Sequence, residues 1–379
     1  MRGYVPMGKQ RQKTNMTPKA NIPIIDIASP DVDRATVARQ LVNAAAEHGF
    51  IYIRSTGKYV TLGDIDTAFS LSKKLFKSPV EEKATCTIQK NNRGWSGMHS
   101  ETLDPKNQKA GHRLAFNFGE FRDGKAQQPL PRTIQPDEPF VNSFSDQCHA
   151  LCLELLELLG IGLEVYAPHP SLPRGRLLTR IQVDPPTFFS SAHLRSRGES
   201  GTILRMLYYP PTSSTTASPD DIRAGAHSDY GSLTLLFRLR GQAGLEILTR
   251  DNAWAPVPVS PTGTESDASP PILVNIGDLL SYWTNGLFRS TVHRVVFGGE
   301  GAEGETDTEP RYSMAFFCHP VGSVALDPVP SERVKGFVAP EGTPNANPYA
   351  ERKVLTADEH LFMRLRESYK GLYKDEPKA

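Results

Sequence analysis

Residues 225–237 read GAHSDYGSLTLLF, and a second histidine follows far downstream in the run STVHRV (290–295). In an extended strand, residues i and i+2 point to the same face, so His227 and Asp229 can reach one ion. His293 lies in another strand-sized run and can complete the set if the strands converge. Two imidazoles and one carboxylate form the facial ligand set of non-haem iron sites, which leaves metal positions open for other ligands.

A further pair of candidate residues lies after the second histidine, in the run Arg311-Tyr312-Ser313. By the same period of two, Arg311 and Ser313 share a strand face, where a guanidinium and a hydroxyl can together hold a carboxylate. Tyr209 offers a phenol for the same group. The residues therefore favour a non-haem iron enzyme that binds an organic acid beside its metal.

Each of these interpretations has an alternative. A His-x-Asp pair is common by chance in a chain with ten histidines, and histidines also serve as hydrogen-bonded structural residues. Zinc accepts the same ligands as iron. A strand arginine often pairs with a nearby acid, and Tyr209 could be an aromatic core residue. The position of Arg311 and Ser313 after His293 favours carboxylate binding beside a metal.

Composition excludes several classes of partner. The chain has 379 residues, 38% hydrophobic and 22% charged, with a net charge of +1. This balance gives no general attraction to nucleic acid or to an anionic membrane, and no run of about 18 apolar residues predicts a membrane span. Residues 1–20 carry five basic and no acidic residues and are expected to be a disordered tail.

The four cysteines favour a reducing environment. Cys148 and Cys152 fall one turn apart on an expected helix, which could suit a metal, but the absence of a C-x-x-C pair favours buried reduced thiols. A reducing, intracellular setting suits Fe(II) chemistry. We therefore expect a cytoplasmic protein.

The order of apolar patterns predicts an α+β fold that is mostly β. We expect helices at 34–48, 64–77, 141–160 and 356–373, the first ended by Gly49. Short apolar runs predict strands at 22–27, 50–53, 113–120, 203–209, 233–237, 245–249, 255–259, 272–276, 288–297 and 311–317. From about residue 202 these runs follow one another without helices, which is typical of an antiparallel barrel or jelly roll.

Longer motifs resemble a known family. IPIIDI (22–27) followed by AAEHGFIYI (45–53), then FKSPVEEK (76–83) and NRGWSG (92–97), are similar to its N-terminal blocks. The catalytic blocks are similar to GAHSDYGSLTLLF, LVNIGDLLSYWTNGLFRSTVHRVV (273–296) and PRYSMAFFCHP (310–320). In this order they resemble the 2-oxoglutarate/Fe(II)-dependent dioxygenases of the isopenicillin N synthase-like family, and its fungal-type members such as thymine hydroxylase, from Ile22 to Tyr373.

The resemblance implies a double-stranded β-helix core flanked by N-terminal helices and a C-terminal helix. It divides the chain into a tail (1–20), an N-terminal dioxygenase region (21–140), a helix with the catalytic jelly roll (141–373) and a short tail (374–379), with 21–373 as one unit. It implies Fe(II), 2-oxoglutarate and O2 as cofactors, with ascorbate as a possible reductant.

The resemblance also implies roles for individual residues. The iron ligands would be His227, Asp229 and His293. Arg311 and Ser313 would bind the distal carboxylate of 2-oxoglutarate, and Tyr209 matches a tyrosine of the family. The chain departs from many relatives by Leu207 in place of asparagine. It also departs by a longer segment at 163–187.

The expected reaction hydroxylates, desaturates or rearranges a small organic molecule, aromatic, heterocyclic or a secondary metabolite, with release of succinate and CO2. Family positions suggest six substrate-contacting residues, for each of which core packing is the alternative: Arg93, Trp95, Phe116, Phe118, Trp283 and Phe317. Two other functions stay open. One is an iron oxidase of the same fold that uses no 2-oxoglutarate, and the other is a catalytically silent binding barrel.

Overall fold

Eight strands form the main sheet in the order β1-β2-β12-β9-β14-β7-β4-β3. The computed structural model describes residues 19–27, 32–54, 57–98, 113–165, 187–211, 222–296, 309–338 and 354–368. The strands are β1 (Ile24–Asp26), β2 (Phe50–Arg54), β12 (Ile272–Ile276), β9 (Leu233–Arg238), β14 (Arg311–Cys318), β7 (Ile203–Tyr209), β4 (Leu114–Phe118) and β3 (Gly94–Ser96). Only the β1–β2 pair among them is parallel; the other pairs are antiparallel.

A second sheet has four strands in the order β11-β10-β13-β8. They are β11 (Trp254–Pro256), β10 (Leu245–Leu248), β13 (His293–Val296) and β8 (Ile222–His227), and all their pairs are antiparallel. A separate hairpin joins β5 (Phe121–Arg122) to β6 (Lys125–Ala126). The two sheets share a buried apolar cluster to which Tyr52, Leu207 and Leu273 contribute from the main sheet, and Ile247 and Val295 from the second. The sheets therefore face each other.

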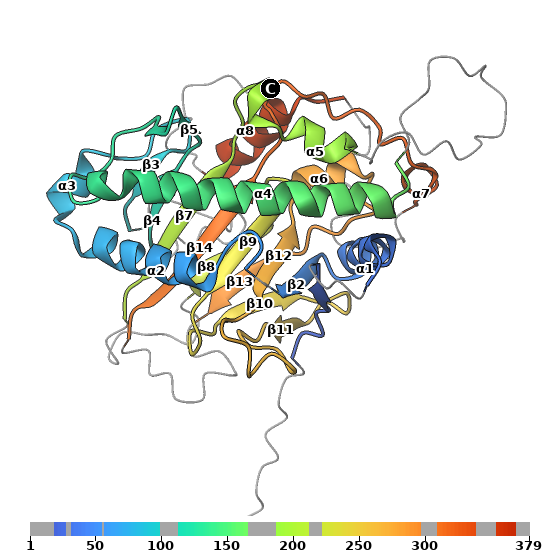
Figure 1. The fold of residues 1–379 in the computed structure, drawn as a ribbon, viewed down its shortest axis with the longest axis horizontal. Coiled ribbons are helices and arrows are strands. Elements are labelled where there is room, and N and C mark those ends of the chain that lie inside the picture. Colours follow the sequence, from blue (N-terminus) through green and yellow to red (C-terminus); the bar gives the residue numbers. More distant parts are fainter. Residues whose placement is uncertain are drawn as a thin grey trace, which may run out of the picture.

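Helices cover the other face of the main sheet, where α4 crosses the strands (Figure 1). The helices are α1 (Arg34–Glu47), α2 (Leu62–Lys77), α3 (Val80–Ala84), α4 (Glu138–Gly162), α5 (Phe188–Ala192), α6 (Asp278–Trp283), α7 (Glu332–Lys335) and α8 (Ala357–Ser368), with short 3-10 turns η1 (Gln135–Asp137) and η2 (Arg195–Arg197). The apolar stripe of α4 that includes Phe144, Leu151 and Leu158 is buried in the larger core. Burial of such a stripe against a sheet accounts for most of a helix's stability in a protein.

Sequence signals explain where α1 begins and ends. Asp33 caps its first turn by accepting hydrogen bonds from the backbone amides of Ala35 and Thr36. Gly49 follows its end at φ +68°, and a side chain there would collide with the carbonyl oxygen of Arg289. Glycine is the residue that adopts this conformation without strain.

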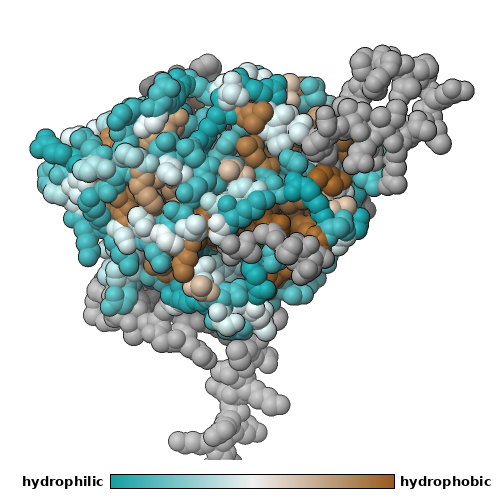
Figure 2. Space-filling view, in the orientation of Figure 1, coloured by the Kyte–Doolittle hydropathy of each residue, from teal (hydrophilic) through white to brown (hydrophobic). Residues whose placement is uncertain are grey.

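The outward face that carries α4 is mostly hydrophilic, interrupted by several groups of apolar side chains (Figure 2). This distribution is ordinary for a folded domain, because polar side chains cannot cover the whole surface. Among the described residues, no helix is long and apolar enough to cross a membrane.

The expected helices and most expected strands are present, while the short elements β3, β5, β6, α3, α5 and α7 were not predicted. The extended segment expected at His227 and Asp229 is β8, but this strand ends at His227 and Asp229 lies beyond it. The helix α6 stands between β12 and β13, where the sequence predicted strands alone. The expected strand at 288–297 is shorter and begins at His293. The expected tail at 1–20 lies outside the described residues except for 19–20, as do residues 374–379 and most of 163–187. All four cysteines are buried free thiols, as predicted.

Candidate metal centre

Three side chains converge where β8 and β13 lie side by side. His227 ends β8, His293 begins β13, and the two residues are paired in register. Asp229 follows two residues after His227. Its Oδ1 lies 3.9 Å from Nε2 of His227 and 3.8 Å from Nε2 of His293. One ligand atom from each residue lies within 4.8 Å of the other two. Among the described residues, no other group of three or more such side chains is gathered in this way.

Hydrogen bonds on the far sides of the imidazoles determine which nitrogen faces the centre. Nδ1 of His227 lies 2.7 Å from the carbonyl oxygen of Gly225, and Nδ1 of His293 lies 3.1 Å from that of Thr291. A carbonyl can only accept, so each Nδ1 carries the proton and each Nε2 presents a lone pair. Burial, with the neighbouring His293, lowers the pKa of His227 to about 3. The ring of His227 is therefore neutral and able to bind a metal.

The two oxygens of Asp229 have different partners. Oδ2 accepts hydrogen bonds of 2.7 Å from both Thr234 Oγ1 and Asn275 Nδ2, which leaves Oδ1 directed at the histidines. Burial acts to raise the pKa of Asp229, but His293, His227 and these two hydrogen bonds together lower it. The group is thus an anionic ligand held in one orientation.

An inner cavity extends from these residues between the two sheets. Arg311, Ser313, Ala315 and Phe317 all line it, so these four residues of β14 share one face as predicted. Nε of Arg311 donates to the carbonyl oxygen of Ala243 at 3.0 Å, and its guanidinium lies 4.9 Å from the ring centre of Tyr209. Nη1 of Arg311 is buried without a hydrogen-bond partner among the described residues.

An outer cavity lies on the other side of His227 and Asp229. His227, Asp229, Arg205 and Phe317 line both cavities, whereas His293 lines only the inner one, so two of the three candidate metal ligands lie where the two spaces meet. The outer space is lined by Leu361 and Leu365 of α8, by Tyr230 in the loop after β8, and by Asn92 and His319.

Of the six suggested substrate residues, only one lines either of these two cavities. Phe317 lines both cavities, whereas Phe116, Phe118 and Trp283 are buried in the core and line neither. The suggestion is corrected for these three. On β4 the reason is strand register, because Phe116 pairs with Met206 on the core side of the sheet while Asn117 pairs with Arg205 on the cavity side.

Trp283 belongs to α6 and packs edge-on against Phe189, with Nε1 donating to the carbonyl oxygen of Asp327 at 2.9 Å. The other two suggested residues lie near the outer cavity but do not line it. Arg93 packs close to Gly119, and Trp95 packs against the larger core. Their neighbour Asn92 lines the cavity instead.

Several residues of the two cavities were missed from the sequence. Arg205 could have been found, because it precedes Leu207 and Tyr209 at a period of two on β7, and all three line the inner cavity. No comparable sequence pattern singles out Thr234 and Asn275. Their role as partners of Asp229 arises only when β9 and β12 pair in the sheet.

Comparisons with known proteins agree with this geometry. A model of the non-haem dioxygenase N-terminal region (in morphine synthesis) matches residues 22–138, and a model of the 2OG-Fe(II) oxygenase superfamily matches residues 200–320. A UPF0676 protein of Schizosaccharomyces pombe is 32% identical over 319 residues, covering 82% of this chain and 86% of its own. The chain belongs to the 2OG-Fe(II) oxygenase superfamily. It is a 2-oxoglutarate-dependent dioxygenase whose family uses Fe(II), 2-oxoglutarate and O2.

Individual oxygenases show the same relationship. The 2-oxoglutarate-dependent dioxygenase frbA of Dothideomycetidae sp. is 29% identical, over 78% of this chain and 84% of its own. The thymine hydroxylase of Neurospora crassa, solved in complex with alpha-KG, superposes with a TM-score of 0.67 at 25% identity, covering 91% of this chain and 95% of that enzyme.

Proposed function

We propose that this oxygenase holds Fe(II) through His227, Asp229 and His293 and oxidises a small organic molecule bound in the outer cavity. The observation that carries the proposal is the convergence of the three side chains, two of which, His227 and Asp229, line both cavities. A metal there can bind 2-oxoglutarate from the inner side and face a substrate on the outer side. The donor set of two imidazoles and one carboxylate suits Fe(II) with open positions.

The inner cavity fits 2-oxoglutarate. Arg311 is 4% exposed, and no carboxylate of the described residues pairs with it. A buried guanidinium with an unpaired Nη1 is costly unless a ligand supplies an acceptor. We assign this role to the distal carboxylate of 2-oxoglutarate, with Ser313 as a second donor. Tyr209 supports the guanidinium with its ring face.

Bound iron and 2-oxoglutarate together supply the oxidising power, with uptake of O2 and release of succinate and CO2. The protein contributes position and exclusion of water. Thr234 and Asn275 fix Asp229, while Arg311 fixes the far end of 2-oxoglutarate. Apolar side chains that line the inner cavity, including Leu207, would keep water away from the reacting atoms once the ligands are bound. No side chain needs to act as a general base.

The outer cavity supports a small, planar or apolar substrate. Phe317 and Tyr230 supply aromatic surface, and Leu361 and Leu365 of α8 supply apolar surface. The Neurospora crassa thymine hydroxylase has been solved with thymine, and several fungal relatives are named 2-oxoglutarate-dependent dioxygenases. We propose an aromatic or heterocyclic compound or a secondary metabolite as substrate, which is hydroxylated, desaturated or rearranged.

We further propose that the two facing sheets form a double-stranded β-helix, and that residues 21–373 act as one catalytic unit. The shared apolar cluster between the sheets supports the first statement. The second is supported by the N-terminal strands, because β1 and β2 join the main sheet beside β12, and β3 and β4 join it beside β7.

The test is succinate formation from 2-oxoglutarate in the presence of Fe(II), screened against aromatic and heterocyclic compounds. We expect turnover that substrate accelerates and that His227→Ala abolishes. His48→Ala is the matched control, because His48 is a part-exposed histidine that lines neither cavity. Substrate oxidation without succinate would favour the oxidase that uses no 2-oxoglutarate. Absence of any iron-dependent turnover would favour a silent binding barrel.

A further inference from the structure

His319 is a buried histidine that lines the outer cavity beside the candidate metal centre. It directly follows β14 and is 5% exposed. Its Nδ1 is buried without a hydrogen-bond partner among the described residues. In the buried His193, by contrast, Nδ1 and Nε2 lie 2.7 Å from the carbonyl oxygen of Phe189 and 2.9 Å from Oγ of Ser232. Native proteins rarely leave such a group unbonded without a ligand or water.

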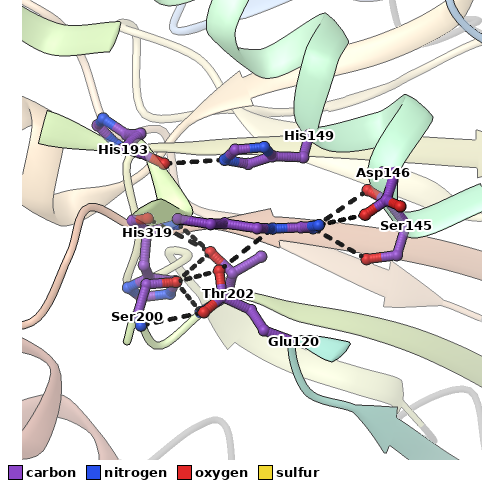
Figure 3. A network of polar contacts seen from close by, with 9 residues as sticks. Glu120, Ser145, Asp146, His149, His193, Ser200, Thr202 and His319 are labelled. Carbon is purple, nitrogen blue, oxygen red and sulfur yellow. Dashed lines mark hydrogen bonds and ion pairs between the residues drawn. The ribbon is translucent and has the colours of Figure 1, made fainter. Parts of the chain in front are cut away.

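The backbone of His319 is held by a polar network (Figure 3). Its amide donates to Oγ1 of Thr202 at 3.1 Å, and its carbonyl oxygen accepts from the same hydroxyl at 3.3 Å. Ser200 connects Thr202 to Glu120 through hydrogen bonds of 2.7 Å and 2.9 Å. Arg195 links Glu120 to α4. The ring is therefore placed through its backbone, and its nitrogens are left for another partner.

Two glycines make room for the ring. A Cβ atom at Gly231 would lie 2.8 Å from Nε2 of His319, and one at Gly201 would lie 3.4 Å from its Nδ1. Any larger residue at Gly231 would press on the imidazole. Burial, with the nearby His360, lowers the pKa of His319 to about 3. A neutral imidazole offers one N–H donor and one acceptor nitrogen.

Arg205 adds a second polar group to the same space. Its Nε donates to Oδ1 of Asn117 at 2.7 Å, and its guanidinium lies 5.4 Å from the ring centre of Phe317. A ligand in this space therefore meets an aromatic face at Phe317, a cation at Arg205 and a neutral imidazole at His319.

We propose that His319 is a positioning residue that hydrogen-bonds a neutral donor–acceptor group of the substrate, such as a cyclic amide or a hydroxyl. The inference rests on the proposed function, because it places the substrate in the outer cavity beside the metal. By holding the polar edge of the molecule, His319 determines which C–H bond turns toward the metal. The proposal therefore implies that the substrate carries such a polar edge and is not a pure hydrocarbon.

The probe is 2-pyridone, a cyclic amide with adjacent donor and acceptor, compared with N-methyl-2-pyridone, which lacks the donor. Binding is measured calorimetrically to the full chain loaded with 2-oxoglutarate and Zn(II), a redox-inert replacement for iron. We expect His319→Leu to weaken 2-pyridone binding about tenfold, the effect of losing one buried hydrogen bond. His319→Gln keeps a donor and an acceptor and should restore most of the affinity. N-methyl-2-pyridone should bind more weakly and distinguish little between the variants.

A second readout follows the ring directly. In side-chain ¹⁵N spectra, 2-pyridone should shift the signals of His319 and leave those of His193 in place. The proposal is overturned if His319→Leu binds 2-pyridone as the wild type does, or if 2-pyridone neither binds nor shifts these signals. Titration of 2-oxoglutarate should give wild-type affinity in both variants. Failure of the wild type to bind Zn(II) and 2-oxoglutarate would instead show that the proposed function is wrong.

Discussion

At the scale of single residues, the candidate metal centre depends on the groups that hydrogen-bond to its ligand side chains. Asp229 presents Oδ1 to the histidines because Thr234 and Asn275 occupy Oδ2. Partners of this kind set the orientation and basicity of metal ligands. The hydrogen bonds of the two histidines to backbone carbonyls have the same effect on Nε2.

Thr234→Val should weaken metal binding, because it removes one of the two hydrogen bonds that orient Asp229. We expect a loss of about tenfold or more in Fe(II) affinity, within the range seen for such partners, measured by anaerobic titration. Thr67→Val is a matched control, since the Thr67 hydroxyl donates to a backbone carbonyl on the exposed side of α2. Equal affinities of Thr234→Val and the wild type would show that Asp229 needs no such support.

Arg311→Gln should weaken 2-oxoglutarate binding by at least tenfold, because a hydrogen-bonded charge contributes about 1.5–3 kcal/mol. Metal affinity in the absence of 2-oxoglutarate should stay near that of the wild type, which separates the two roles. Arg240→Gln, a change at an arginine whose Nη1 donates to Ser260, serves as the control. A KM for 2-oxoglutarate unchanged by Arg311→Gln would place the cosubstrate elsewhere.

At the scale of elements, α8 is attached to the segment that carries the ligands. Arg364 of α8 forms a 2.8 Å ion pair with Asp278, which also accepts hydrogen bonds from Ser228 and Ser290. Tyr230 is hydrogen-bonded to Ser368 at the end of α8. These contacts join the wall of the outer cavity to both ligand segments.

Arg364→Ala should loosen α8 without removing the inner site. The partly buried carboxylate of Asp278 would lose its cation, so we expect faster amide hydrogen exchange across residues 357–368. The affinity for 2-oxoglutarate should change by less than about threefold, since Arg364 does not line the inner cavity. Arg366→Ala, on the same helix, is the matched control. Unchanged exchange in Arg364→Ala would mean that apolar packing alone holds α8.

At the scale of the whole molecule, buried neutral histidines make the fold sensitive to acid. Burial lowers the pKa of His149 to about 4 and that of His193 to about 3. Below pH 6.5 the unfolded chain takes up protons at these residues while the folded chain does not. Their contribution to stability is therefore complete above pH 6.5 and is lost as the pH falls toward 4 and 3.

The free energy of unfolding of the metal-free protein should decrease by about 1.4 kcal/mol per pH unit for each such histidine between pH 6 and 4. His193→Gln should reduce this slope by about that amount, because an amide keeps a donor and an acceptor but does not titrate. Denaturant unfolding at pH 6, 5 and 4 measures both slopes. Identical slopes would show that His193 is protonated in the folded protein.

Much of the fold followed from sequence periodicity, because period-two runs and helical stripes report local geometry. The shared face of Arg311, Ser313, Ala315 and Phe317 was predicted in this way. Which side of β4 faces the cavity could not be predicted, since both Phe116 and Asn117 are buried. Only pairing with β7 fixes that choice. The sequence did not point to His319 either, because whether its ring nitrogens have hydrogen-bond partners depends on how the surrounding residues pack.

The most direct test of the central claim is a crystal grown without oxygen in the presence of Fe(II) and 2-oxoglutarate, with anomalous scattering measured at the iron absorption edge. We predict one iron peak bound by Nε2 of His227, Nε2 of His293 and Oδ1 of Asp229. Electron density for 2-oxoglutarate should extend from that peak to Arg311. An iron peak away from these three atoms, or 2-oxoglutarate that does not reach Arg311, would contradict the proposal.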